Sequence, residues 1–144
     1  MQTRLLVMVV ILVSSAVLGC TSGPASRAAS KTIQVSMDDV LKQSVIGQDV
    51  TLAVGDTLKV TLGSNHTTPY HWTADAKIGD PTILKQTGHD YVRPNSAAMG
   101  APGVEVWMFT ALKAGTTTIV TDYTCIVGSD PMPVSTFTAG VTVQ

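Results

Sequence analysis

The chain has 144 residues, with nine Lys and Arg against ten Asp and Glu, and a formal net charge of −1 at pH 7. This balance leaves no basic patch, so nucleic acid is not an expected partner. The only two cysteines, Cys20 and Cys125, exclude a framework of several disulfides.

The N-terminal segment, residues 1–19, has the features of a secretory signal peptide. Its first four residues carry one positive charge, and residues 5–18 are almost wholly apolar but shorter than the ~20 residues that span a membrane. The run ends in Val17-Leu18-Gly19-Cys20, which resembles a bacterial lipobox. The resemblance implies cleavage before Cys20, lipid such as palmitate on its sulfur, and anchoring to the extracytoplasmic side of the bacterial cell envelope. The alternative is an ordinary secretory signal followed by a chance cysteine.

Residues 20–30 are predicted to be the lipidated cysteine and a flexible tether, because they are small, polar and contain Pro and Gly. Residues 31–144 then form one domain that is large enough for a single core. Loss of Arg4 with the signal leaves eight positive charges against ten negative ones, a net charge of −2. If Cys20 carries lipid, Cys125 has no intrachain partner, and we expect it to be a small buried residue.

The predicted domain is β-structure almost throughout, because valine and threonine dominate and Gly, Pro, Asn and Asp recur at short intervals. Alternation places Leu58, Val60 and Leu62 on one face of a strand. It does the same for Trp107, Phe109 and Ala111, which we expect in the core. In chain order, the predicted strands are 49–54, 56–62, 70–76, 81–88, 104–112, 116–124 and 133–144, and residues 37–43 fit one helical turn.

Seven or eight short strands separated by turns predict an all-β antiparallel sandwich. One irregular segment, residues 88–103, is long enough to indicate a functional loop. Because a sandwich collects its loops at two ends, this segment could meet residues 64–72, SNHTTPYHW, at one of them.

No catalytic constellation is recognisable, since the chain lacks Gly-x-Ser-x-Gly and phosphate-binding glycine loops, and Glu105 is its only glutamate. We therefore predict neither enzymatic activity nor a cofactor. A copper-type site with Cys125, Met132 and histidines is a weaker alternative, because no histidine follows Cys125. The odd spacing of His66 and His71 would also put them on opposite faces of a strand.

Residues 54–72, VGDTLKVTLGSNHTTPYHW, resemble the chagasin-like inhibitors of papain-family cysteine peptidases. In that family, Gly-Asp introduces a strand that leads to Asn-Pro-Thr-Thr-Gly-Tyr and then to a tryptophan. The residues kept here are Asn65, Thr67, Thr68, Tyr70 and Trp72. His66 replaces the family's proline and Pro69 its glycine, and proline fixes φ near −65°, so we expect a rigid loop of altered shape.

A second block, residues 100–123, resembles the family's Gly-x-Gly-Gly loop, the following strand and the Ala-x-x-x-Gly turn. Gly100 and Gly103 match, whereas Pro102 stands where the family prefers glycine. The third family motif, Arg-Pro-Trp or similar, is replaced by Cys125-Ile126-Val127. The resemblance covers about residues 49–143.

The resemblance implies an immunoglobulin-like antiparallel β-sandwich whose three neighbouring loops form a wedge at one end. The wedge would enter the active-site cleft of a papain-like cysteine peptidase and inhibit it reversibly, and we expect the inhibitor to be a monomer. The first loop would lie nearest the catalytic cysteine and the other two against the cleft walls. The implied peptidase-binding residues are Asn65, His66, Thr67, Thr68, Pro69, Tyr70, Gly100, Ala101, Pro102, Gly103, Cys125, Ile126 and Val127.

A stiff loop suits this role, because less conformational entropy is then lost on binding. Thr67 and Thr68 are β-branched, and their hydroxyls can bond either to the cleft or to the loop's own backbone. A polar surface turn is the simpler interpretation of the same two threonines. The missing third motif also leaves open an envelope-anchored immunoglobulin-like binding or adhesion module without inhibitory activity.

Overall fold

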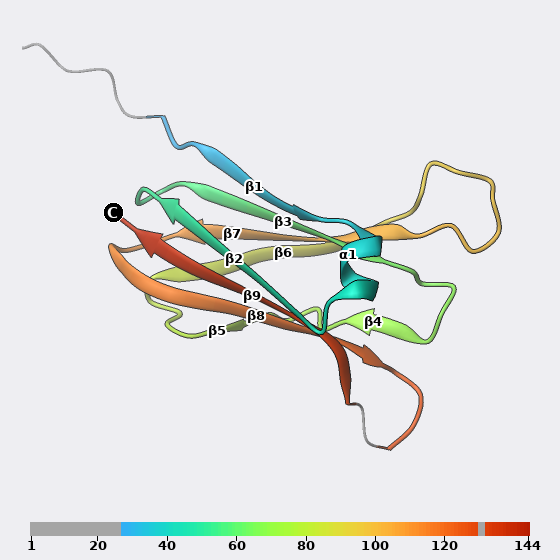
Figure 1. The fold of residues 1–144 in the computed structure, drawn as a ribbon. Coiled ribbons are helices and arrows are strands. Elements are labelled where there is room, and N and C mark those ends of the chain that lie inside the picture. The colour runs from blue at the N-terminus through green and yellow to red at the C-terminus, as the bar shows by residue number, and fades with distance from the viewer. Residues whose placement is uncertain (1–26, 130–131) are drawn as a thin grey trace, which may run out of the picture.

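The computed structural model describes residues 27–129 and 132–144 (Figure 1). The predicted signal peptide and the lipidation site Cys20 lie outside these residues. Among the residues described, no helix has both the length and the apolar character needed to cross a membrane. Ordered contacts begin slightly before the predicted domain, because the backbone N–H of Ala29 donates to Asp56 Oδ1 at 2.9 Å.

Two sheets face each other in the described part of the chain (Figure 1). One sheet has the order β1-β3-β7-β6, and the other has the order β2-β9-β8-β4, with the short β5 paired to β8. The elements are β1 (Ser30–Val35), α1 (Met37–Lys42), β2 (Val45–Leu52), β3 (Thr57–Ser64), β4 (Tyr70–Trp72), β5 (Lys77–Ile78), β6 (Leu84–Val92), β7 (Gly103–Ala111), β8 (Gly115–Cys125) and β9 (Pro133–Val143).

The predicted immunoglobulin-like β-sandwich is confirmed, with differences at its edges. Residues 27–129 and 132–144 hold nine strands, and both sheets are mixed because β1 pairs parallel to β3 and β2 pairs parallel to β9. The strand predicted at 81–88 runs on to Val92, so the irregular loop predicted at 88–103 is shorter and covers residues 93–102. The strand predicted at 70–76 ends at Trp72.

The core lies between the sheets and follows the alternation seen in the sequence. Along β7, every second residue from Gly103 to Ala111 is buried, and β8 and β9 alternate in the same way over most of their length. Leu58, Leu62 and Phe109 are fully buried, and Trp72 packs edge-on against Trp107 with ring centroids 6.5 Å apart. These contacts confirm that the two tryptophans and Phe109 belong to the core.

The helical turn expected at residues 37–43 is α1, which lies against β3 near the loop end of the sandwich (Figure 1). Ser36 caps its N-terminus by accepting a hydrogen bond from the Asp39 N–H at 3.2 Å. The backbone of Met37 lies so close to Gly63 that a Cβ at this glycine would clash with it. The helix is therefore held firmly on β3, and a side chain at Gly63 would displace it.

Candidate functional site

Three loops lie at the same end of the sandwich (Figure 1). Loop 1 is residues 65–69 between β3 and β4, loop 2 is residues 93–102 between β6 and β7, and loop 3 joins β8 to β9 from residue 126. Strand pairing brings them together, because Ser64 pairs with Gly103 and Tyr70 pairs with Cys125. The three segments named from the sequence are therefore neighbours in space.

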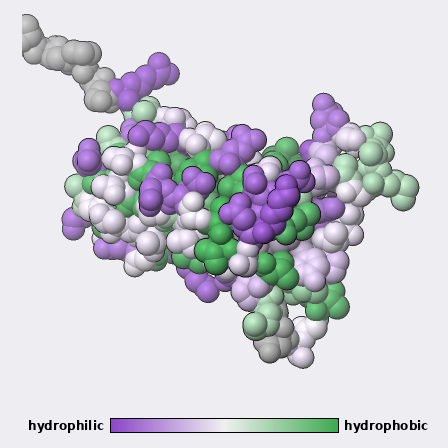
Figure 2. All heavy atoms as spheres, in the orientation of Figure 1, coloured by the Kyte–Doolittle hydropathy of each residue, from purple (hydrophilic) through white to green (hydrophobic). Residues whose placement is uncertain are grey.

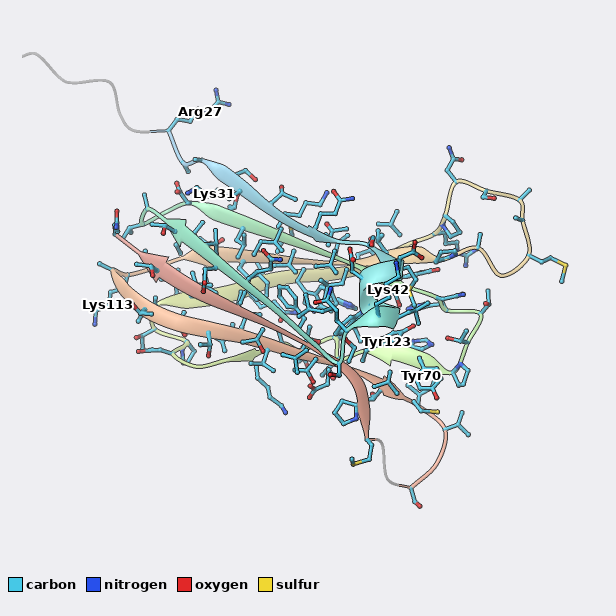
Figure 3. All side chains as sticks on the ribbon, viewed as in Figure 1. Arg27, Lys31, Lys42, Tyr70, Lys113 and Tyr123 are labelled. Atoms are coloured by element: carbon cyan, nitrogen blue, oxygen red, sulfur yellow. The ribbon has the colours of Figure 1, made fainter. Side chains whose placement is uncertain are left out.

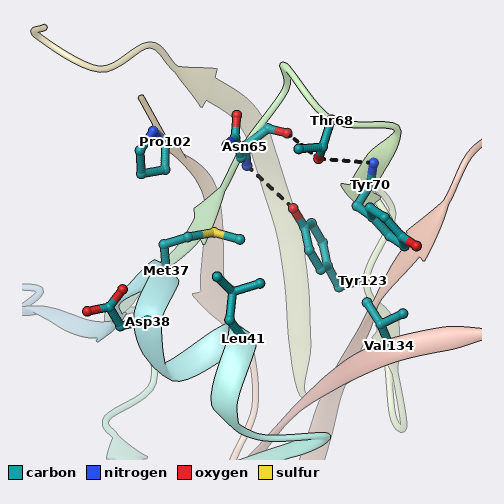
Figure 4. A pocket seen from close by; sticks show the side chains of 9 residues that line it. All are labelled: Met37, Asp38, Leu41, Asn65, Thr68, Tyr70, Pro102, Tyr123 and Val134. Carbon is teal, nitrogen blue, oxygen red and sulfur yellow. Dashed lines mark hydrogen bonds between the residues drawn. The ribbon is translucent and has the colours of Figure 1, made fainter. Parts of the chain in front are cut away.

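Asn65 organises loop 1 with its own side chain and backbone. Its Oδ1 accepts hydrogen bonds from the N–H and the hydroxyl of Thr67, at 3.1 and 2.7 Å. Its carbonyl accepts from the N–H and the hydroxyl of Thr68, at 3.0 and 2.7 Å (Figure 4). Both threonine hydroxyls thus bond within the loop, which closes it into a tight turn.

The same asparagine ties loop 1 to its surroundings. Its Nδ2 donates to the carbonyl of Gly100 in loop 2 at 3.1 Å. Its N–H donates to the hydroxyl of the buried Tyr123 at 3.4 Å (Figure 4). On the other side, the N–H of Ile126 donates to the carbonyl of Pro69 at 2.8 Å, which joins loop 3 to loop 1. Loop 1 is therefore the central member of a hydrogen-bonded set of three.

The apex of loop 1 is formed by Thr67 and Pro69, which are exposed. Asn65, Thr68 and Tyr70 are partly buried at its base. Each non-glycine residue in the described part of the chain has a negative φ. Pro69 therefore stands where the family has glycine without requiring the positive φ that proline cannot adopt.

Loop 2 is exposed over most of its length, and it is partly buried at Ala101 beside β7. Gly100 is exposed and has a φ of 78°, a conformation that glycine adopts far more easily than other residues. Ala101 is partly buried and Pro102 is exposed. Gly103 is buried as the first residue of β7, and a Cβ there would clash with Val92 and Tyr91. The structure thus places Gly103 behind the loop rather than on its outer surface.

Loop 3 presents apolar residues in place of the family's charged and aromatic motif. Ile126 and Val127 are 63% and 71% exposed. Cys125 is only partly buried, and its thiol donates to the carbonyl of Val127 at 3.3 Å. The expected full burial of Cys125 is therefore wrong, because the residue lies at the end of β8 where the core opens.

A buried carboxylate, Glu105 on β7, lies directly behind loop 1 and was not predicted as a site residue. It is 1% exposed. Its Oε1 accepts from the hydroxyl of Ser64 at 2.7 Å and lies 3.0 Å from His66 Nε2, and its Oε2 lies 2.8 Å from His89 Nε2. Because an ionised carboxylate only accepts hydrogen bonds, both rings donate to it through Nε2–H.

The hydrogen bonds around Glu105 determine its ionisation. Burial raises its pKa, but the bonds from Ser64, His66, His89 and the Trp72 N–H together hold the pKa below its ordinary value of 4.5. The carboxylate is therefore charged at neutral pH, and the two imidazole rings point at a fixed negative charge.

His66 is also held by stacking, since its ring lies against Tyr91 and His71 with centroid distances of 3.5 and 4.0 Å. The predicted separation of His66 and His71 onto opposite faces is wrong, because His66 belongs to loop 1 and not to a regular strand. Glu105 could have been found from the sequence: it occupies a core position in phase with Trp107 and Phe109, where a charged residue requires partners.

Comparison with known proteins places these features in one family. The chagasin family of peptidase inhibitors, I42, matches residues 51–141. The crystal structure of the cysteine protease inhibitor EhICP2 from Entamoeba histolytica is similar with a TM-score of 0.60, 19% identity, and coverage of 80% of this chain and 97% of that one. The structure of PbICP-C, solved in complex with falcipain-2, is similar with a TM-score of 0.60 and 20% identity, and the match covers 79% of this chain and 99% of that one. The solution structure of amebosin is similar with a TM-score of 0.52 and 24% identity, and the match covers 79% of this chain and 97% of that one. A search of curated proteins returned no match.

Proposed function

Since the chain belongs to the chagasin family of peptidase inhibitors, we propose that it inhibits papain-like cysteine peptidases by placing loops 1–3 in their active-site cleft. The observation that carries this proposal is the set of hydrogen bonds by which Asn65 and Pro69 join the three loops into one surface. The solved complex of the similar PbICP-C with falcipain-2 supports a partner of this class. The protein is an inhibitor and not an enzyme.

The geometry explains how loop 1 can bind without serving as a substrate. Its turn is closed by the hydrogen bond from the Thr68 N–H to the Asn65 carbonyl, which opposes the extended conformation of a bound substrate. Pro69 removes further backbone freedom at the apex. Because the loop is already ordered, binding loses little conformational entropy. The bound loop also has no need to rearrange, so rearrangement does not release it from the cleft.

Loop 3 gives this wedge a different character from the family pattern. Ile126 and Val127 offer exposed apolar side chains where the family has a charged and an aromatic residue. We propose that they contact an apolar part of the cleft wall, so that the change alters target choice. The same substitution favours the second candidate function, a binding module that has kept the scaffold and lost inhibition.

Anchoring to the bacterial cell envelope is also part of the proposal, and it is supported by the Val17-Leu18-Gly19-Cys20 sequence alone. A Cys20→Ser substitution is expected to abolish labelling with palmitate. Unchanged labelling would contradict this part of the proposal.

The test is a titration of papain and several related peptidases with residues 27–144, which hold all nine described strands and whose folding is checked by thermal unfolding. Reversible inhibition without cleavage is expected from the wild-type domain. Thr67→Arg should abolish it, because the bulk is added at the exposed apex. The control is Thr116→Arg, an exposed threonine at the other end of β8, roughly 30 Å away for a strand of this length. No inhibition of any peptidase at micromolar concentration would favour the binding module.

A further inference from the structure

A groove of about 530 Å³ opens beside loop 1, between that loop and α1 (Figure 4). Met37 and Leu41 of α1 form one wall and Val134 of β9 forms another. Tyr70 of β4 and Pro102 of loop 2 border it, and the buried Tyr123 forms its floor. The groove is mainly apolar, and Figure 2 shows hydrophobic patches beside the hydrophilic outer face of α1.

Two apolar side chains that line the groove are exposed. Leu41 is 71% exposed and Val134 is 50% exposed, although both have the core-forming side chains that usually avoid water. Contiguous apolar surface of this kind marks an interaction site more often than single exposed residues do.

The groove is preformed, because its helical wall is fixed at both ends. The Ser36 cap and the close approach of Met37 to Gly63 hold the start of α1. After the helix, Ser135 Oγ donates to the carbonyl of Gln43 at 2.9 Å, which joins the wall of α1 to that of β9. A ligand would therefore meet a rigid groove rather than a flexible flap.

The groove is continuous with the surface that we propose for the peptidase. Asn65, Thr68, Tyr70 and Pro102 belong both to its lining and to the predicted binding residues. A stable protein complex buries about 800 Å² of each partner, an area that extends beyond the apex of one tight loop onto neighbouring surface. α1 itself lies before residues 51–141, outside the region that the family model matches.

We infer that the groove between α1 and loop 1 binds an apolar side chain on the rim of the same peptidase whose cleft receives the loops. The inference rests on the proposed function. It adds a second contact beside the loops, and it assigns Leu41 a role in selecting the target.

Leu41→Ser is the test, with Leu112→Ser as its matched control. Leu112 is also an exposed leucine, 46% accessible, but it lies beside Lys113 at the end of the sandwich opposite Tyr70 (Figure 3). Both variants should unfold within a few degrees of the wild type. The inhibition constant for the most strongly inhibited peptidase should rise ~10-fold for Leu41→Ser, as expected for losing one buried leucine contact. It should stay within about twofold for Leu112→Ser, whose side chain lies far from the contact.

Three outcomes would overturn the inference. If Leu41→Ser inhibits as well as the wild type while Thr67→Arg does not inhibit, the loops bind the peptidase and the groove does not. If sedimentation shows that the wild-type domain self-associates and that Leu41→Ser is monomeric, the groove binds a second copy instead. If the wild type inhibits no peptidase, the proposed function fails and the inference fails with it.

Discussion

The Nε2 atom of His66, in loop 1, lies 3.0 Å from Oε1 of Glu105, a carboxylate buried in β7. A residue that replaces the family's proline thus fixes the loop by a hydrogen bond to the core rather than by a restricted φ. Ser64 and the N–H of Trp72 donate to the same oxygen, so the last residues of β3 and β4, the two strands that the loop joins, are held as well.

Replacing Glu105 by glutamine should destabilise the domain by about 2 kcal/mol at pH 7, because hydrogen bonds to a charged group are lost or weakened in a buried site. Urea unfolding measures this loss. Glu105→Gln should also weaken inhibition, since the hydrogen bond that holds His66 would be lost or weakened while its stacking on Tyr91 and His71 remains. The matched control is Asp90→Asn, a carboxylate on the neighbouring β6 that is exposed, and it should change stability little.

The stability of the wild type should also depend on pH through Glu105. Its pKa is lowered on folding, so its contribution is complete above the ordinary value of about 4.5 and is lost as the pH falls through the lower folded value. Asp56 and Asp80 also have lowered pKa values, from the hydrogen bonds of Ala53 and Ala29 and of Thr82, and they contribute in the same acidic range. The difference between wild type and Glu105→Gln isolates the one group: it should shrink between pH 5 and pH 3. A difference that is constant over this range would contradict the assignment.

Two substitutions at Asn65 separate its two roles. Asn65→Asp keeps an oxygen for the turn with Thr67 but loses the Nδ2 donor to Gly100, so loop 1 should remain closed while its link to loop 2 breaks. Asn65→Ala loses both and should cost about 1 kcal/mol of stability. We expect weaker inhibition from Asn65→Asp and still weaker inhibition from Asn65→Ala, measured as inhibition constants. Equal constants for wild type and Asn65→Asp would show that the link between the loops is not needed.

Gly100→Ala tests the conformation of loop 2. A Cβ there would meet no neighbouring atom, so its effect comes from the positive φ of 78° alone and should be a loss of about 1 kcal/mol. Gly47→Ala is the control, because a Cβ at Gly47 is equally unobstructed and its φ lies outside the positive range. Equal unfolding free energies for the two variants would argue that loop 2 relaxes without strain.

Local patterns predicted the strands that alternate cleanly. Leu58, Val60 and Leu62 show the strict period of two that a half-buried strand requires. The extent of β6 was harder to predict, because a bulge between Gln86 and Gly88 breaks the alternation of its side chains. The parallel pairing of β2 with β9 joins residues about 90 positions apart, and no local pattern reports such a contact.

The sequence likewise predicted the loop residues of the candidate site, but not the hydrogen bonds between them. Residues near loop 1 were identified by the family resemblance, and the placement of three loops together followed from the sandwich. The hydrogen bond from Asn65 to Gly100 links residues 35 positions apart. The two histidines that bond to Glu105 come from loop 1 and from β6. Such contacts depend on strand register, which the spacing of residues in the chain does not determine.

The central claim, that the loops occupy the cleft, is tested most directly by alkylation of the peptidase's catalytic cysteine. Papain is mixed with an excess of residues 27–144 and treated with iodoacetamide, and its modification is followed by intact mass, which separates it from alkylated Cys125 of the inhibitor. We predict that the wild-type domain protects the catalytic thiol in proportion to the bound fraction and that Thr67→Arg does not protect it. A tight complex whose catalytic thiol reacts as fast as that of free papain would contradict the account.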